Sequence, residues 1–152
     1  MNKQELEDRL IDFAATIIIL ASKFEKNYAG SHLAGQIIRS GTSPALNYGE
    51  AQSAESTKDF IHKMGICLKE LRESFVCLKI IEKANLTNEI NNLISAKTEV
   101  NELISIFVSS IKTAKTNLKY FLISIIKLIV TKNLKSKIVN HQSKIEYFLI
   151  FK

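Results

Sequence analysis

The sequence predicts an all-α protein, an antiparallel up-down-up-down four-helix bundle with an extra C-terminal tail that can itself be helical. Three observations predict this fold. The chain has 152 residues, enough for one domain with a sizeable core. It contains only five glycines and one proline, so turn signals are scarce. Apolar residues also repeat at steps of three and four over long stretches, and long helices with short connections form antiparallel bundles.

The first helix is predicted to span 3–26. Asn2 and Glu5 have the spacing of an N-terminal cap. Gly30, in the stretch "NYAGS", predicts a stop signal between helices, and Ser31 predicts the cap of the next helix. The apolar residues of the first helix share one face, which predicts a buried seam. They are Leu6, Leu10, Phe13, Ile17, Leu20 and Phe24.

The second helix is predicted to span 31–54 and contains the unusual stretch "IIRSGTSPALNYGE". Pro44 removes a backbone hydrogen bond in mid-helix, so we expect a kink or a restart there, with Ser43 as the cap of a restarted helix. The clustered Ser, Gly, Thr and Pro also leave a loop open as an alternative. If the segment is helical, its polar residues fall at steps of four and three and form one continuous polar stripe. They are Gln36, Ser40, Ser43, Asn47 and Glu50.

The third helix is predicted to span 56–84, because Ser56 and Asp59 have capping-box spacing, and the fourth to follow a cap at Thr87. Cys67 and Cys77 lie ten residues apart on the third helix, about 15 Å, which is too far for a disulfide. They are therefore interpreted as small apolar residues in a reducing compartment. The apolar stripes predict core positions. They are Phe60, Met64, Cys67, Leu71, Phe75, Leu78 and Ile81, then Ile90, Leu93, Ile94, Val100, Ile104, Phe107 and Ile111.

The net charge of +6 belongs entirely to the C-terminal tail. Residues 1–117, the predicted four-helix bundle, contain 14 basic and 14 acidic residues. Residues 118–152 contain seven lysines and one acidic residue, Glu146. The high isoelectric point therefore says nothing directly about the main domain.

The tail is a basic, low-complexity extension that lacks Ala, Gly, Pro and Asp. Its restricted composition resembles translated AT-rich DNA. The alternative is a basic amphipathic segment for a membrane surface or RNA. We expect poor packing beyond Thr131, whereas the first part of the tail can extend the fourth helix through its apolar residues Leu118, Phe121, Leu122 and Ile125.

The sequence favours a cytoplasmic protein without a membrane span. It opens with "MNKQELEDRL", which is acidic where a secretory signal would be basic. The longest apolar runs, 14–21 and 120–130, are shorter than the roughly 20 residues that span a bilayer.

No recognisable catalytic or metal-binding motif is present. Only "DFIH", Asp59 to His62, approaches the spacing of a di-metal bundle site, and a second such motif is missing. Ser40 and Ser43 have no evident general base, and no Gly-rich phosphate loop occurs. We therefore expect neither enzymatic activity nor a cofactor or metal.

The polar stripe has two interpretations. In the structural one, Arg39, Asn47 and Glu50 join Glu70 and Glu73 in a half-buried network that fixes helix register, because buried polar groups need partners. In the functional one, the stripe lines a surface for another subunit or for nucleic acid.

The stretch "QIIRSGTSPALNYGEAQSAESTKDFIHKMGICLKELRES" resembles the bacterial four-helix-bundle proteins associated with intervening sequences in 23S ribosomal RNA genes. The resemblance covers roughly residues 3–117, and "SSIKTAKTN" matches the usual end of the family. Pro44 and the tail after Asn117 depart from the family pattern. The signature positions matched are Arg39, Ser40, Ser43, Asn47, Glu50, Asp59, Phe60, Ile61, Lys63 and Glu70.

This resemblance implies an up-down bundle without enzymatic activity, whose relatives assemble as ring-shaped homopentamers. The fold is also similar to the accessory protein of diversity-generating retroelements, which binds nucleic acid and assists a reverse transcriptase. The leading hypothesis is therefore a cytoplasmic, non-enzymatic homo-oligomer that binds RNA, DNA or a nucleoprotein partner. A reverse-transcriptase-like protein or another protein is a further candidate partner. The alternative is a self-assembling protein-interaction scaffold that does not bind nucleic acid.

Nucleic-acid binding by a bundle without net charge requires cations segregated onto one face and multiplied by assembly. Contacts are expected mainly with phosphates. The candidate basic residues are Arg39, Lys58, Lys63, Lys69 and Arg72, and the further interface candidates are Ser40, Ser43, Asn47 and Glu50.

Overall fold

The computed structural model describes residues 1–150, which form four α-helices and no strand. The helices are α1 (Lys3–Ala21), α2 (Tyr28–Gln52), α3 (Thr57–Lys83) and α4 (Ile90–Ile150). Two compact units are present, Met1–Ala114 and Lys115–Lys152. The division lies within α4, three residues before the boundary expected from the sequence at 117.

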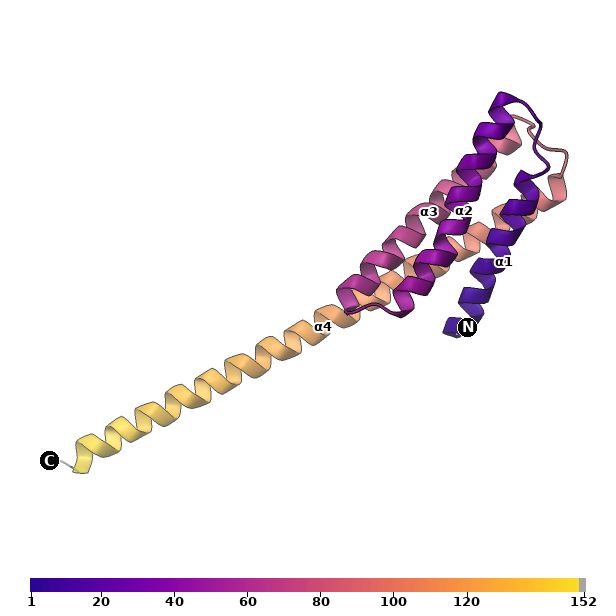
Figure 1. The fold of residues 1–152 in the computed structure, drawn as a ribbon. Coiled ribbons are helices and arrows are strands. Elements are labelled where there is room, and N and C mark those ends of the chain that lie inside the picture. The colour runs from indigo at the N-terminus through magenta and orange to yellow at the C-terminus, as the bar shows by residue number, and fades with distance from the viewer. Residues whose placement is uncertain (151–152) are drawn as a thin grey trace. The chain divides into compact units, whose positions relative to one another are not determined.

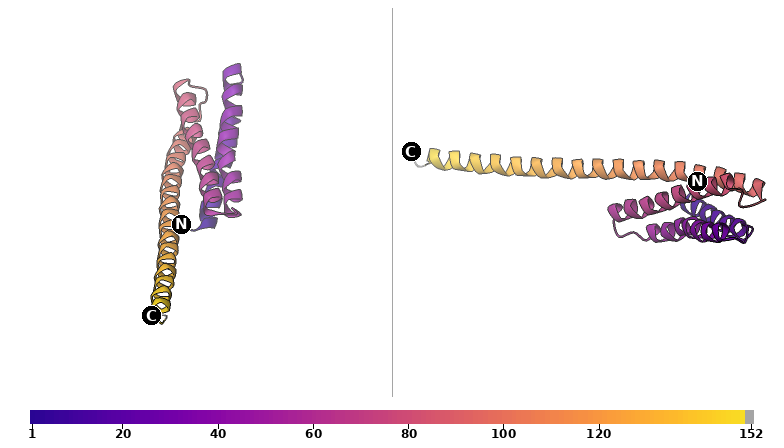
Figure 2. Two further views of the ribbon diagram at one scale, coloured as in Figure 1. Left: turned by 90° about the vertical axis from the view of Figure 1, so that its left-hand side faces the viewer. Right: turned by 90° about the horizontal axis from the view of Figure 1, so that it is seen from above.

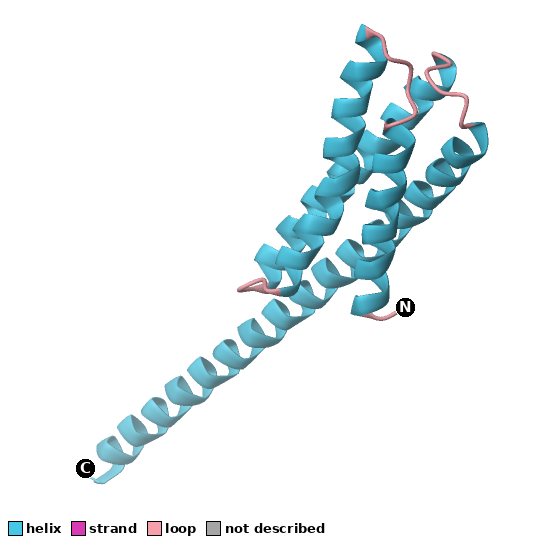
Figure 3. Cartoon of the chain, turned by 45° about the vertical axis from the view of Figure 1, so that its right-hand side comes forward, coloured by secondary structure: helices cyan, strands magenta, loops and turns pink. Residues whose placement is uncertain are grey.

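The first unit is an antiparallel four-helix bundle, which confirms the predicted fold class. In it α1, α2, α3 and the first part of α4 lie side by side (Figures 1 and 2). The α1–α2 and α3–α4 connections lie at one end of this unit, and the α2–α3 connection lies at the other (Figure 3). Buried apolar side chains from all four helices fill its centre, including Leu10, Phe13, Ile37, Leu71 and Phe107.

Two of the predicted helix starts are confirmed in atomic detail. Asn2 Oδ1 accepts a hydrogen bond from the Glu5 amide at 2.9 Å, and Glu5 Oε2 accepts one from the Asn2 amide at 2.8 Å. At the start of α3, Ser56 Oγ accepts from the Asp59 amide at 3.1 Å. Each side chain satisfies an amide that has no partner within its own helix.

The connection between α1 and α2 differs from the prediction. α1 ends at Ala21, although Phe24 beyond it is still buried in the core. The cap of α2 is Asn27, whose side chain accepts from the Gly30 amide at 2.8 Å, so the cap predicted at Ser31 is wrong. Asparagine caps as well as serine does, and starting earlier adds another turn of helix around Gly30.

α2 continues through Pro44, so the predicted restart with Ser43 as cap is wrong, and the loop alternative is wrong too. Pro44 is buried, and its carbonyl oxygen accepts a hydrogen bond from Cys67 Sγ on α3 at 3.5 Å. Proline costs the helix one internal hydrogen bond. Packing of α2 against α3 compensates for that loss.

α3 ends in a Schellman motif that the sequence did not predict. Asn85 has a positive φ of 51°, the left-handed conformation that asparagine tolerates better than most residues. The Leu86 amide donates to the carbonyl of Ile81 at 3.2 Å, and the Asn85 amide donates to that of Glu82 at 3.2 Å. Thr87, predicted as the cap of α4, lies three residues before that helix begins at Ile90, and its hydroxyl oxygen accepts from the Glu89 amide at 3.2 Å in the preceding turn rather than from an amide of the helix.

The second unit is the C-terminal part of α4. Its side chains are exposed from residue 119 to 132. No helix within the described residues is long and apolar enough to cross a membrane.

Candidate nucleic-acid interface

The polar stripe of α2 faces α3, and its centre is a pair of buried serines. Ser74 Oγ donates to Ser40 Oγ at 3.0 Å, and neither residue has any exposed surface. The sequence pointed to Ser40 but not to Ser74. A serine within the otherwise apolar stripe of α3 was the signal that could have identified this partner.

Two ion pairs flank the serines. Arg39 Nη2 donates to Glu73 Oε1 at 3.1 Å, although the Arg39 side chain remains 67% exposed. Lys63 Nζ donates to Glu50 Oε2 at 2.8 Å, and this hydrogen bond raises the pKa of Lys63. Two of the predicted phosphate-binding cations, Arg39 and Lys63, therefore pair with carboxylates and connect α2 to α3.

The remaining stripe residues contact their own helix. Asn47 Nδ2 donates to the backbone oxygen of Ser43 at 2.9 Å and to its hydroxyl oxygen at 3.0 Å. Glu70 has no ion-pair partner among the described residues. Two residues of the stripe, Ser40 and Glu50, therefore pair α2 with α3, whereas Ser43 and Asn47 bond to each other within α2.

The outward face of α3 has a different character, because it carries exposed cations along most of the helix. At 100° per residue these residues occupy an arc of about 100° opposite the core, over a length of about 37 Å. We call this set the α3 basic face. It consists of the five cations Lys58, Lys69, Arg72, Lys79 and Lys83 together with His62, all of which are exposed.

The acidic residues of α3 lie outside that arc. Glu73 is paired with Arg39, and Glu82 accepts from Lys97 Nζ on α4 at 2.6 Å. Asp59 and Glu70 lie nearer to the side that faces α2. A bundle without net charge therefore presents one helix face with cations and no carboxylate.

Lys79 and Lys83 were not among the residues predicted from the sequence. They continue the steps of three, four and seven residues that connect Lys69 and Arg72 to the start of the helix. That spacing was the signal that could have found them.

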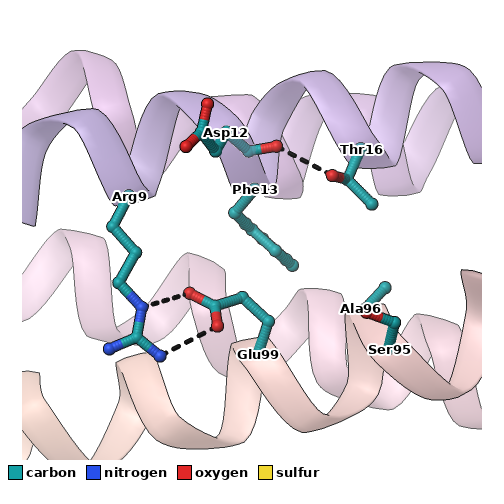
Figure 4. Close-up of a pocket in the computed structure, with 7 residues that line it drawn as sticks. All are labelled: Arg9, Asp12, Phe13, Thr16, Ser95, Ala96 and Glu99. Atoms are coloured by element: carbon teal, nitrogen blue, oxygen red, sulfur yellow. Dashed lines mark hydrogen bonds and ion pairs between the residues drawn. The ribbon is translucent and has the colours of Figure 1, made fainter.

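A cavity of about 240 Å³ lies between α1 and α4 (Figure 4). Its polar end is occupied by Arg9, whose Nε lies 2.5 Å from Glu99 Oε1 and whose Nη2 lies 2.8 Å from Glu99 Oε2. Glu102 also pairs with this guanidinium, and hydrogen bonds to the two carboxylates raise the pKa of Arg9. Because its charge is already compensated, Arg9 is a poor anion ligand. The lining residues are Arg9, Asp12, Phe13, Thr16, Ser95, Ala96 and Glu99.

A more open hollow of about 680 Å³ lies where α2 ends and α3 begins, lined by Glu50, Glu55, Asp59 and Lys63 among others. Within the described part of the chain, no group of three or more histidine, cysteine or acidic residues is arranged to hold a metal ion. Cys67 and Cys77 are buried free thiols.

Comparison with known proteins identifies the family. The family model described as 23S rRNA-intervening sequence protein matches residues 3–109. The chain belongs to this family. The match contains every candidate site residue named above and ends before the exposed part of α4.

A solved structure supports the assignment to this family. The chain is similar to the crystal structure of a protein of unknown function from the S23 ribosomal protein family of Bacteroides thetaiotaomicron. The two share 29% sequence identity with a TM-score of 0.67, over 74% of this chain and 99% of the other. No curated protein gives a match to this sequence.

Proposed function

We propose that this intervening-sequence family protein is a non-enzymatic, cytoplasmic homo-oligomer that binds nucleic acid through the α3 basic face. The observation that carries the proposal is the alignment of exposed cations along α3 without a carboxylate among them. Such a face suits the phosphate backbone, which supplies most of the affinity in sequence-independent recognition.

The proposed ligand set differs from the one expected from the sequence. Lys58, Lys69 and Arg72 remain candidates because they are exposed and have no ion-pair partner among the described residues. Lys79 and Lys83 join them. The five cations of one subunit make a modest site, and assembly of several subunits would multiply it through effective concentration.

A self-assembling scaffold is the second candidate function, and one observation favours it. The outer side of α1 exposes three isoleucines, Ile11, Ile18 and Ile19, at 51%, 49% and 60%. Exposed aliphatic residues gathered on one helix are typical of protein contacts. Both candidates therefore include self-association and differ in whether nucleic acid binds.

The proposal is tested by titrating fluorescent structured RNA and duplex DNA with the full chain at several salt concentrations. Variants are made in a background in which all seven lysines of residues 118–152 are replaced by glutamine, because the basic tail alone could bind a polyanion. In that background, the test variant is Lys69→Gln/Arg72→Gln. The matched control, Lys23→Gln/Lys26→Gln, removes the same charge from exposed residues outside the α3 basic face.

We expect salt-sensitive binding that the test variant weakens and the control leaves nearly unchanged. Each lost phosphate contact lowers the slope of log K against log salt by about one. Equal losses of affinity in both variants would show that binding depends on net charge and not on the α3 basic face. No binding in the tail-neutralised background, combined with a stable oligomer, would leave the scaffold as the better function.

A further inference from the structure

The described part of the second unit carries an apolar helix face that is exposed to solvent. Between residues 118 and 131 the large apolar side chains occupy an arc of about 220° around the helix axis. The narrower remaining arc carries Tyr120, Ser124, Lys127 and Thr131. The exposed apolar residues of this arc include Phe121, Leu122, Ile125, Ile126, Leu128 and Ile129.

Charge indicates what covers this face. Between Glu102 and Glu146 the chain has no acidic residue, whereas Lys119, Lys127 and Lys132 lie in or beside the apolar segment. A second copy of this helix would bring lysines together without a carboxylate to compensate them, which is unfavourable along a helix pair. RNA would satisfy the lysines but leave the aliphatic side chains in water.

An anionic lipid surface accommodates both the aliphatic side chains and the lysines. Aliphatic side chains enter the boundary between headgroups and acyl chains, and lysines contact the anionic headgroups. Lys119 and Lys132, near the ends of the apolar segment, can extend their charged ends to the interface while their stems remain in apolar surroundings. A helix of 18 residues from 118 to 135 has a length of about 27 Å. No described helix is long and apolar enough to cross the bilayer, so the segment is considered as a helix at the membrane surface.

We propose that residues 118–135 form an interfacial helix that binds the surface of an anionic membrane. The site uses residues outside the family match and outside the α3 basic face, so it stands independently of nucleic-acid binding. It would give this protein a membrane-surface location that the bundle does not provide.

Cosedimentation of the full chain with vesicles tests the proposal. The vesicles contain either phosphatidylcholine alone or phosphatidylcholine with phosphatidylglycerol. The apolar variant is Ile125→Ser/Ile129→Ser, with Ile90→Ser/Ile94→Ser in the first unit as its matched control. The charge variant is Lys127→Gln/Lys132→Gln, with Lys23→Gln/Lys26→Gln in the first unit as its control. Circular dichroism and thermal melting establish that the bundle is intact in every variant.

We expect binding to the mixed vesicles only. The apolar variant should lose more than about tenfold in affinity, and the charge variant about fivefold for each lysine. Both controls should bind as the unmodified chain does. Absence of binding to mixed vesicles, or binding that the apolar variant retains in full, would overturn the proposal. A dimer in sedimentation analysis that only the apolar tail variant dissociates would assign the face to a second copy instead.

Discussion

Ser74 and Ser40 share a hydrogen bond of 3.0 Å at the centre of the α2–α3 interface, and both are fully buried. Replacing either residue by alanine should destabilise the bundle by about 1–2 kcal/mol, because the remaining hydroxyl would be buried without its partner. The double variant should cost clearly less than the sum of the two single variants. Urea denaturation of the four proteins measures this coupling, and strictly additive losses would contradict it.

Gly41 lies where α1 and α2 approach closely. A Cβ atom at this position would lie 2.8 Å from Ile17 Cγ2 and 3.1 Å from its Cβ. Gly41→Ala should therefore destabilise the protein by about 1–3 kcal/mol, although alanine is the better helix former.

Gly35→Ala is the matched control within the same helix, because a Cβ there would meet nothing within 4 Å. This variant should gain about 0.5–1 kcal/mol from alanine's helix propensity. Thermal or chemical denaturation compares the two substitutions. The close-approach argument fails if they shift stability in the same direction by similar amounts.

The Arg9–Glu99 pair connects α1 to α4 through two hydrogen bonds. Arg9→Met should cost about 1–2 kcal/mol at neutral pH, because it leaves Glu99 and Glu102 near each other without their cation. Adding Glu99→Met should recover part of this loss. A double-mutant cycle in urea measures this coupling. The pairing would be contradicted if the double variant lost as much stability as the sum of the losses in the two single variants.

Cys67 should make the protein less stable at alkaline pH. Burial raises the pKa of its thiol from 9.0 to about 12. Above pH 9 the unfolded chain loses this proton while the folded chain keeps it, so stability falls as pH rises through that window. The slope attributable to this thiol approaches about 1.4 kcal/mol per pH unit.

Cys67→Ala should remove that component of the slope, whatever it does to stability at neutral pH. Stability curves at pH 8 to 11 for the two proteins measure the difference. Burial also raises the pKa of Cys77, so neither thiol should react with a thiol reagent at pH 8 before the bundle unfolds. Rapid labelling of the native protein would contradict this protection.

The sequence allowed the fold to be predicted because local signals agree with the global arrangement. The capping residues Asn2 and Ser56 act through their own helices, and the apolar periodicity defines the core faces. Ile90 and Ile94 are exceptions, because they were predicted as core positions and are 50% and 51% exposed. Asn27 was overlooked because Ser31 offered a similar signal after a glycine. Either residue type suits the position chemically, and packing around Gly30 decides between them.

The candidate site was less predictable, because pairing across helices depends on their rotation and register. The polar stripe on α2 could be recognised from spacing, but its partners Ser74 and Glu73 could be matched to Ser40 and Arg39 only with the helices in place. For the same reason, the sequence alone could not show which cations remain exposed in the folded bundle. Lys63 and Lys69 look alike in sequence, yet only Lys63 has a carboxylate from another helix beside it.

The close approach at Gly41 also bears on how the bundle folds. Bundle helices with repeating apolar faces can pair in registers displaced by one turn, at little cost in buried area. A one-turn displacement would oppose Ile17 with Ile37 or Ala45 in place of the glycine, so the helices would have to separate. Slipped intermediates are thereby raised in energy relative to the native pairing. Refolding should consequently proceed with few kinetic traps despite the repetitive sequence.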